Sequence, residues 1–278
     1  MINSGNRLKN KVAIVTGAGT RTKLTGTGQA AAILFAREGA SVLLVDNNED
    51  HALRTQEAIQ KDGGTASVFV ADVSRNEGCD AAVDAAMSHY SALHILINNV
   101  GISRPGTVVD VKEEDWDEVQ RVNLKSMMLT SRHAIPRMIE AGGGTIVNVS
   151  SIDGLRAGWS YNVAYSAAKA GVIGLTKAMA IQHGRDQIRV NCIAPGQLHA
   201  ALTSGLSQAH RDMRRRSTPL GTEGTAWDVA WAAVFLASAE SRWITGVTLP
   251  VDAGSLAAHP LSVAPRDAEG ILPIIDED

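Results

Sequence analysis

The sequence lacks the features that mark secreted, membrane-spanning and disulfide-rich proteins. Its two cysteines, Cys79 and Cys192, lie far apart, and we interpret them as small apolar core residues in a reducing compartment. No stretch approaches roughly 18 apolar residues, which excludes a membrane-spanning helix. The N-terminal segment MINSGNRLKN contains no apolar run of the kind found in a signal peptide. We therefore expect a cytoplasmic protein.

Strong net charge and metal-binding motifs are also missing. The formal net charge of -3 gives no electrostatic basis for binding nucleic acid or an anionic membrane. No group of Cys, His, Asp and Glu has the spacing of metal ligands, and no G-x-S-x-G nucleophile motif occurs. What remains is an ordinary composition, 45% hydrophobic and 20% charged, in 278 residues that suit one large α/β domain.

Short β-branched runs alternate with helical stretches along the chain. The expected strands are Val12–Thr16, Ser41–Asp46, Ala66–Ala71, Leu93–Asn98, Thr145–Ser150, Ile188–Ile193 and Val247–Val251. The expected helices are Gly28–Glu38, Glu49–Lys61, Arg75–Tyr90, Glu113–Glu140, Ser160–His183 and Ala226–Ser238. This alternation predicts a single Rossmann-type α/β domain, a doubly wound parallel sheet of about seven strands flanked by helices.

Two segments do not follow the alternation. Residues 197–224 are long and polar, and we expect them to form a substrate loop within a catalytic domain that spans residues 1–254. The loop carries four arginines, which form either an anion-binding site or a solvated helix face: Arg211, Arg214, Arg215 and Arg216. Residues 255–278, rich in Pro and acids, form a separate C-terminal tail without a clear period.

A Y-x-x-x-K pattern, Tyr165 to Lys169, carries the first indication of chemistry. Residues four apart are neighbours on one helix face, so the ammonium can lie under the phenol. A free tyrosine has a pKa near ~10, and a fixed cation nearby favours its phenolate. Together with a bound oxidised nicotinamide, this lysine would make the tyrosine a base matched to neutral pH.

A glycine-rich turn follows the first expected strand, in the sequence TGAGTRTKLTGTGQAAA. Glycines there let the backbone turn tightly and approach a pyrophosphate, which then rests on a helix N-terminus. The candidates for this turn are Gly17, Gly26 and Gly28. Arg21 and Lys23 lie between them, and they either touch a phosphate or form a solvated loop tip.

With these motifs in this order, the chain resembles the classical short-chain dehydrogenase/reductase family over residues 8 to 254. The family pattern T-G-x-x-x-G-x-G has three residues where this chain has eight between Gly17 and Gly26, a five-residue insertion. Asp46 ends the second strand, where the resemblance places the adenosine ribose. A carboxylate accepts both ribose hydroxyls of NAD and repels the 2′-phosphate of NADP, so NAD is the expected cofactor.

The resemblance implies further cofactor contacts. Asp72-Val73 is similar to the family's adenine-contacting D-V pair, and Asn98-Asn99-Val100-Gly101 to its N-N-A-G motif. Pro195-Gly196 resembles the P-G turn beside the nicotinamide. In the family a threonine usually follows that turn and reaches the carboxamide. Here Ala200 stands in its place, and either Thr203 substitutes or the contact is made by the backbone.

The catalytic residues implied by the resemblance are Ser151, Tyr165, Lys169 and Asn123. Ser151 hydrogen-bonds the substrate oxygen, Tyr165 is the acid/base, and Lys169 lowers the phenol pKa and holds the nicotinamide ribose. Asn123 seats a water in the proton path from Lys169. Ser151 and Tyr165 are fourteen positions apart where the family usually has thirteen, and Ser150 is the alternative. Trp159, Gln197 and His199 are either pocket residues or ordinary packing and loop residues.

These expectations converge on an oxidoreductase that interconverts a small or cyclic secondary alcohol and its ketone by hydride transfer to or from NAD. By resemblance, the enzyme is a homotetramer, with an interface supplied by the helices 113–140 and 160–183. Two alternatives stay open. One is an NADP-dependent reductase of 3-oxoacyl thioesters, for which the arginines of residues 211–216 would dock a phosphopantetheine carrier. The other is a non-catalytic NAD-binding regulator.

Overall fold

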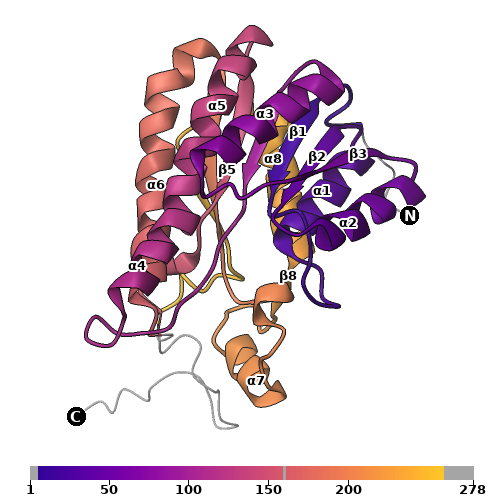
Figure 1. The fold of residues 1–278 in the computed structure, drawn as a ribbon. Coiled ribbons are helices and arrows are strands. Elements are labelled where there is room, and N and C mark those ends of the chain that lie inside the picture. Colours follow the sequence, from indigo (N-terminus) through magenta and orange to yellow (C-terminus); the bar gives the residue numbers. More distant parts are fainter. Residues whose placement is uncertain (1–5, 159–160, 260–278) are drawn as a thin grey trace, which may run out of the picture.

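A computed structural model describes residues 6–158 and 161–259, and within them seven strands form one parallel sheet (Figure 1). The strands are β1 Val12–Thr16, β2 Ser41–Asp46, β3 Thr65–Val70, β4 Ile95–Asn98, β5 Gly144–Val149, β6 Ile188–Pro195 and β9 Thr248–Val251. Their order is β3-β2-β1-β4-β5-β6-β9. The sheet therefore grows outward in both directions from β1 and β4, which confirms the predicted doubly wound fold.

Helices cover both faces of this sheet. They are α1 Thr27–Arg37, α2 Glu49–Lys61, α3 Asn76–Tyr90, α4 Glu113–Gln120, α5 Ser126–Glu140, α6 Val163–His183 and α8 Ala226–Ala237. Alternate strand residues enter two separate cores, because successive side chains of a strand point to opposite faces. Val15 packs with Phe35 of α1 and Val234 of α8, whereas Ile14 packs with Met138 of α5 on the other face.

The helix predicted for residues 113–140 is interrupted by a π-helical turn, Arg121–Lys125, between α4 and α5. A π turn adds one residue without changing which residue types are apolar, so the hydrophobic period does not reveal it. The predicted start of the next helix at Ser160 lies outside the described residues, and α6 begins at Val163.

The polar segment 197–224, expected as a substrate loop, contains a helix, α7 Gln208–Arg216, which carries the four arginines. A short two-stranded sheet, β7 Leu198–His199 with β8 Gly224–Thr225, closes the segment at its base. Because both ends of the segment are tied by this pairing, α7 stands at the mouth of the cleft that the strand ends form. In Figure 1 it lies below the carboxyl ends of the strands.

Within residues 6–158 and 161–259, no helix is both long and apolar enough to cross a membrane. The same part of the chain contains no group of three or more His, Cys, Asp or Glu side chains arranged to hold a metal ion.

Candidate active site

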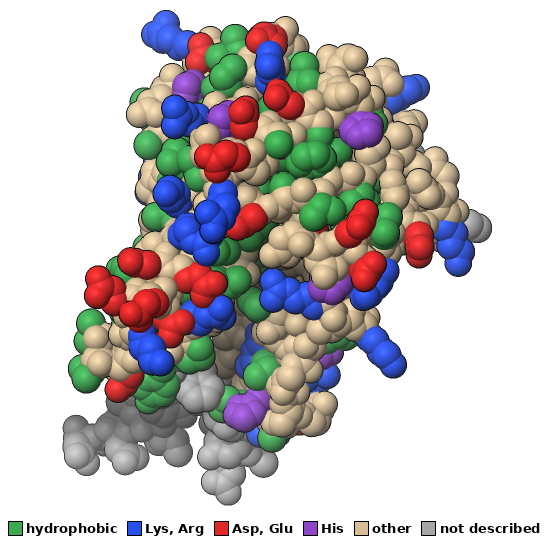
Figure 2. Space-filling view, viewed as in Figure 1, with side chains coloured by type: hydrophobic (Ala, Val, Ile, Leu, Met, Phe, Trp, Pro, Cys, Tyr) green, Lys and Arg blue, Asp and Glu red, His purple; other side chains and the backbone are tan. Residues whose placement is uncertain are grey.

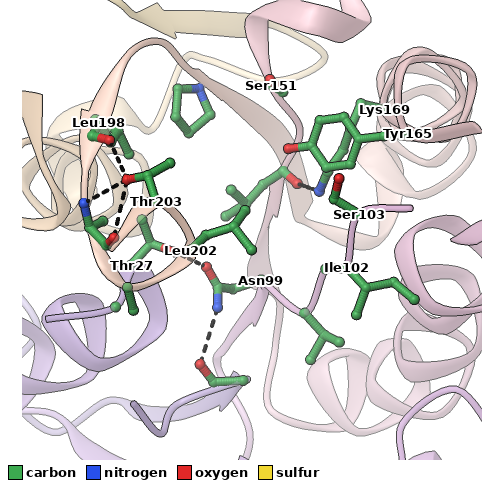
Figure 3. Close-up of a pocket in the computed structure, with 18 of the residues that line it drawn as sticks. Thr27, Asn99, Ile102, Ser103, Ser151, Tyr165, Lys169, Leu198, Leu202 and Thr203 are labelled. Carbon is green, nitrogen blue, oxygen red and sulfur yellow. Dashed lines mark hydrogen bonds between the residues drawn. The ribbon is translucent and has the colours of Figure 1, made fainter. Parts of the chain in front are cut away.

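A large cleft opens at the carboxyl ends of the parallel strands, between the strand-following loops and α7 (Figure 3). In an open parallel sheet, ligands bind at this edge, where the strand order reverses. The cleft brings together twelve predicted residues: Gly17, Gly26, Gly28, Asp46, Asp72, Val73, Asn99, Gly101, Tyr165, Lys169, Pro195 and Gly196. Ser151 lines it as well, whereas Asn123 lies just outside.

Lys169 lies on the second turn of α6 and is almost entirely buried, with 3% of its surface exposed. Its Nζ donates a hydrogen bond of 2.7 Å to the carbonyl of Val149 at the end of β5. The same atom lies 5.5 Å from the ring centroid of Tyr165. Burial lowers the pKa of Lys169 to about 8, so the group remains mostly protonated at pH 7.

Burial has the opposite effect on Tyr165 and raises the pKa of its phenol to about 12. A hydrogen bond with Ser151 partly offsets this rise, and the negative charge of Asp153 adds to it. Desolvation of the phenolate is thus the largest effect on this pKa in the chain alone. In this state the phenol is a proton donor. The lowering by Lys169 together with an oxidised nicotinamide stays a prediction.

The two adjacent serines after β5 have different partners. Ser150 is buried and its hydroxyl donates to the backbone carbonyl of Lys169 at 2.7 Å, which fixes α6 against the strand end. Ser151 Oγ accepts from the backbone N–H of Asp153 at 3.2 Å, and its hydroxyl acts on the phenol of Tyr165 so as to lower the phenol pKa. The geometry thus favours Ser151 over Ser150 as the hydroxyl available to a ligand.

Asn123 sits in the π-helical turn and is fully buried. Its Oδ1 accepts from the N–H of Ile102 at 2.8 Å, and its Nδ2 donates to the carbonyl of Ile102 at 2.9 Å. A Cβ on Gly101 would lie 3.4 Å from Lys169 Nζ and 3.7 Å from Asn123 Oδ1. Two side-chain hydrogen bonds from Asn123 therefore hold the loop after β4 beside Lys169. The predicted role of Asn123, binding a water in the proton path, did not include these bonds.

The glycine-rich turn is built for close approach of a ligand. Gly17 has a φ of +64°, and a Cβ at Gly28 would lie 2.1 Å from the carbonyl oxygen of Gly17. Gly26 has more room, since the nearest atom to a Cβ there would be 3.5 Å away. Gly26 provides no side-chain cap for α1, whose first turn also has no acidic residue. Backbone N–H donors of this helix end are therefore open to an anion.

Gly19 belongs to the same turn, although it was not among the glycines predicted to contact the cofactor. Its N–H donates to Asp46 Oδ2 at 2.9 Å, and a Cβ there would lie 2.6 Å from Cβ of His51. Asp46 Oδ1 accepts from the N–H of Asn48 at 3.1 Å. The carboxylate is thus fixed at the cleft wall. The signal for Gly19 was present in the sequence, as the second glycine of T-G-A-G.

The inserted residues form a compact flap, closed by a hydrogen bond of 2.8 Å from Thr20 Oγ1 to the carbonyl of Leu24. Arg54 of α2 donates to the carbonyl of Thr20 at 3.4 Å and holds the flap from outside. Arg21 lines the cleft, whereas Lys23 does not. Of the two flap cations, only Arg21 is therefore placed to meet a ligand.

The predicted adenine and strand-end residues are tied into the frame. Asp72 accepts from the N–H of Ser74 at 2.9 Å, and although burial opposes its ionisation, bonds from Ser74 and the charge of Arg121 lower its pKa overall. Asn99 Nδ2 donates to the carbonyls of Thr16 and Gly17, both at 3.2 Å. Asn99 therefore braces the glycine-rich turn from below.

Past Pro195 and Gly196, the loop does not offer a free threonine. The hydroxyl of Thr203 donates to the carbonyl of Leu198 at 2.7 Å and accepts from the N–H of Ala200 at 3.2 Å (Figure 3). The hydroxyl is thus used to stabilise its own turn. Gln197 lines the cleft, whereas His199 does not. Trp159 lies outside the described residues.

Three of the four arginines of α7 pair with acidic side chains. Glu223, with 3% of its side chain exposed, pairs with Arg211 at 2.9 Å and with Arg214 at 3.1 Å. Arg215 pairs with Asp212 in the same helix. Arg216 has no acidic partner among the described residues, whereas the pairs of Arg211 and Arg214 bind α7 to the base of the segment. The choice between an anion-binding site and a solvated helix face stays open.

Comparison with known proteins places this cleft among related ones. A family model described as Enoyl-(Acyl carrier protein) reductase matches residues 22–255. The 3-oxoacyl-[acyl-carrier-protein] reductase FabG of Chlamydia muridarum is 42% identical over 248 residues, which cover 89% of this chain and 98% of the relative. The 2,5-dichloro-2,5-cyclohexadiene-1,4-diol dehydrogenase LinX of Sphingobium indicum is 36% identical, covering 90% of this chain and 97% of the relative. A solved structure from Burkholderia xenovorans, titled as a short-chain dehydrogenase/reductase, superimposes with a TM-score of 0.87 at 36% identity, covering 91% of this chain and 99% of that one.

Proposed function

Because this chain belongs to the classical short-chain dehydrogenase/reductase family and is an oxidoreductase of that family, we propose that it interconverts a secondary alcohol and a ketone with NAD as cofactor. The substrate is a small or cyclic alcohol held between Ser151, Tyr165 and the underside of α7. The observation that carries the proposal is the convergence of Ser151, Tyr165 and the buried Lys169 on one face of a cleft whose other end is an uncapped helix N-terminus.

The residues present fit a nicotinamide dinucleotide. The glycine cradle at Gly17 and Gly28 leaves no space for a side chain, and the free N–H groups of α1 suit a pyrophosphate. Asp46, Asp72, Val73 and Lys169 all line the cleft. Asp46 would hold the adenosine ribose, Asp72 and Val73 would contact the adenine, and Lys169 would hold the nicotinamide ribose. When bound, the nicotinamide supplies the hydride donor or acceptor, and the protein supplies the proton chemistry.

In the direction of ketone reduction, the neutral Tyr165 phenol donates its proton to the substrate oxygen. Ser151 hydrogen-bonds that oxygen and stabilises the charge it gains. Lys169, charged at pH 7, stabilises the tyrosinate left behind. In the direction of alcohol oxidation the same groups act in reverse, and the phenol must first lose its proton. That step requires a further positive charge in addition to Lys169, because burial holds the pKa of Tyr165 at about 12.

The position of Asp46 supports NAD over NADP. Its carboxylate is fixed at the cleft wall by the N–H groups of Gly19 and Asn48. A 2′-phosphate at about 4 Å from this charge would cost roughly 4 kcal/mol at an effective dielectric of 20. Arg21 is the cation of the flap that lines the cleft, and the proposal assigns it to the pyrophosphate rather than to a 2′-phosphate.

Reduction of a 3-oxoacyl thioester with NADP is the second candidate, and it is favoured by the name of the Chlamydia muridarum relative. The surface around the cleft argues against an acidic carrier protein. Figure 2 shows acidic side chains gathered over α4, whose first turn holds Glu113, Glu114 and Asp115. The arginines opposite, Arg211 and Arg214, share the single carboxylate of Glu223, which offsets half of their charge. The name of the LinX relative, a cyclic diol dehydrogenase, instead supports a cyclic alcohol.

Replacement of Tyr165 by phenylalanine tests the proposal. Tyr165→Phe keeps the ring that packs in the cleft and removes the acid/base, so cofactor binding should persist while turnover falls by about 10²–10⁴-fold. Turnover is measured on a panel of cyclic secondary alcohols with NAD and with NADP. Near-normal turnover by the variant would remove Tyr165 from the mechanism. Cofactor binding without turnover by the wild type on the whole panel would favour the regulator instead.

A further inference from the structure

We propose that Ser103 and Asn162 form a subsite for a second oxygen atom of the substrate, so that the preferred alcohol carries a hydroxyl besides the one that reacts. This inference rests on the proposed function and concerns the substrate class. Both residues line the cleft, and Figure 3 shows Ser103 on the same side as Tyr165 and Lys169.

The loop that carries Ser103 is fixed at both ends. At Ile102, both backbone groups are bound by the side chain of Asn123. At Gly106, the N–H donates to the carbonyl of Tyr161 at 2.6 Å, and the carbonyl accepts from the N–H of Val163 at 3.2 Å. Only three residues separate these fixed points, so the position of Ser103 is set by the frame rather than by the ligand, as a specificity site requires.

Asn162 connects this loop to the catalytic helix. It is the residue immediately before α6, three positions ahead of Tyr165, and its Nδ2 donates a hydrogen bond to Ser103 Oγ. A group bound by the pair is therefore held within one helical turn of the acid/base. The pair lies on the wall that the loop after β4 forms, whereas Ser151 approaches from the end of β5.

Hydrogen-bonding capacity remains unused at this pair. Asn162 Oδ1 is enclosed and has no hydrogen-bond partner in the described part of the chain. Ser103 Oγ accepts from Asn162, and none of its bonds to described residues uses its own proton. Ser103 lines the cleft, so a substrate hydroxyl there can accept the unused serine proton. A substrate without that hydroxyl displaces water from the half-buried serine and leaves its proton without a partner, which discriminates against such a substrate.

The test compares cyclohexanol with the 1,2-, 1,3- and 1,4-cyclohexanediols, which move the second oxygen around one ring. We expect at least one diol to exceed cyclohexanol in kcat/KM by about tenfold, the effect of one well-placed hydrogen bond. Ser103→Ala should remove that preference and leave kcat/KM for cyclohexanol unchanged, while Ser103→Thr, which keeps the hydroxyl, should retain part of it. Ser88→Ala, the same change on the exposed face of α3, is the matched control.

Equal kcat/KM for cyclohexanol and every diol in the wild type would overturn the subsite. An equal loss on all four alcohols in Ser103→Ala would overturn it too, because a structural role does not distinguish the substrates. If the melting temperature shows that Ser103→Ala is unfolded, the subsite is judged from the wild-type comparison of the four alcohols and from Ser103→Thr. Absence of turnover on every alcohol with either cofactor would instead refute the proposed function, and the subsite with it.

Discussion

Lys169 holds a positive charge where water does not reach it, and the protein loses stability as a result. Burial lowers its pKa from 10.5 to about 8. Between these values the unfolded chain binds more protons than the folded one, so the stability contributed by this residue rises with pH across that window. A shift of this size corresponds to about 3 kcal/mol of cost, which is present in full below pH 8. A functional demand for the ammonium explains why such a cost is kept.

Substitution of Lys169 by methionine should therefore have a pH-dependent effect on stability. The gain in unfolding free energy of Lys169→Met over the wild type should be about 2–3 kcal/mol larger at pH 7 than at pH 10. Urea unfolding of both proteins at the two pH values measures it. The Tyr165 phenol does not obscure the result, since its raised pKa decreases stability only above pH 10. If the difference in unfolding free energy between the two proteins does not change with pH, Lys169 is not both charged and buried in the folded protein.

The inserted flap is the element where this chain departs most from the family pattern. Its base is closed by Thr20 and Leu24, and it presents Arg21 to the cleft while Lys23 points elsewhere. We expect Arg21→Ala to raise the KM for NAD about threefold to tenfold, because a charge-assisted bond to phosphate is lost. Lys23→Ala, the same loss of charge on the same flap, should leave KM unchanged. Equal effects of the two variants would indicate a general electrostatic influence instead of a contact.

Elements with a regular period were predictable from the sequence, and elements held by tertiary bonds were not. The strands around Ile14 and Leu43 are continuous apolar runs, as expected for strands covered on both faces. Gly17, Asp46 and Tyr165 then reach one cleft because the carboxyl ends of parallel strands share an edge. The fold and most of the site followed from these patterns and from the family resemblance.

The features that were missed depend on contacts between distant residues. The π turn around Asn123 is fixed by two bonds to Ile102, twenty-one positions away. Helix α7 is stabilised by Glu223, whose partners Arg211 and Arg214 look like a solvated cluster in the sequence. The raised pKa of Tyr165 likewise comes from burial, which a local sequence pattern does not report.

At the scale of the whole molecule, apolar side chains near the β9 edge of the sheet are left exposed. Ile181 at the end of α6 is 84% exposed and Trp243 is 92% exposed. The end of α6 and the segment that follows α8 meet here, since a Cβ at Gly246 would lie 3.5 Å from Ala180 Cβ. Large apolar side chains this exposed are candidates for an interface, where a contiguous apolar patch would be buried. Together with the family expectation, they support the proposed homotetramer.

Sedimentation velocity at micromolar concentration measures this assembly directly. We expect a single species with four times the mass of the chain. Trp243→Glu should shift it to smaller species, because a charge would be placed in an apolar contact. A monomeric wild type would contradict the tetramer without affecting the site.

The central claim, a dinucleotide site selective for NAD, is tested most directly by titrating the protein with NADH and with NADPH. Quenching of the fluorescence of its five tryptophans follows the binding. The account predicts tight binding of NADH, weak binding of NADPH, and a narrowed difference in Asp46→Ala, which removes the charge that faces the ribose. Tight NADPH binding by the wild type, or an unchanged ratio in Asp46→Ala, would contradict it and assign the ribose site to Arg21.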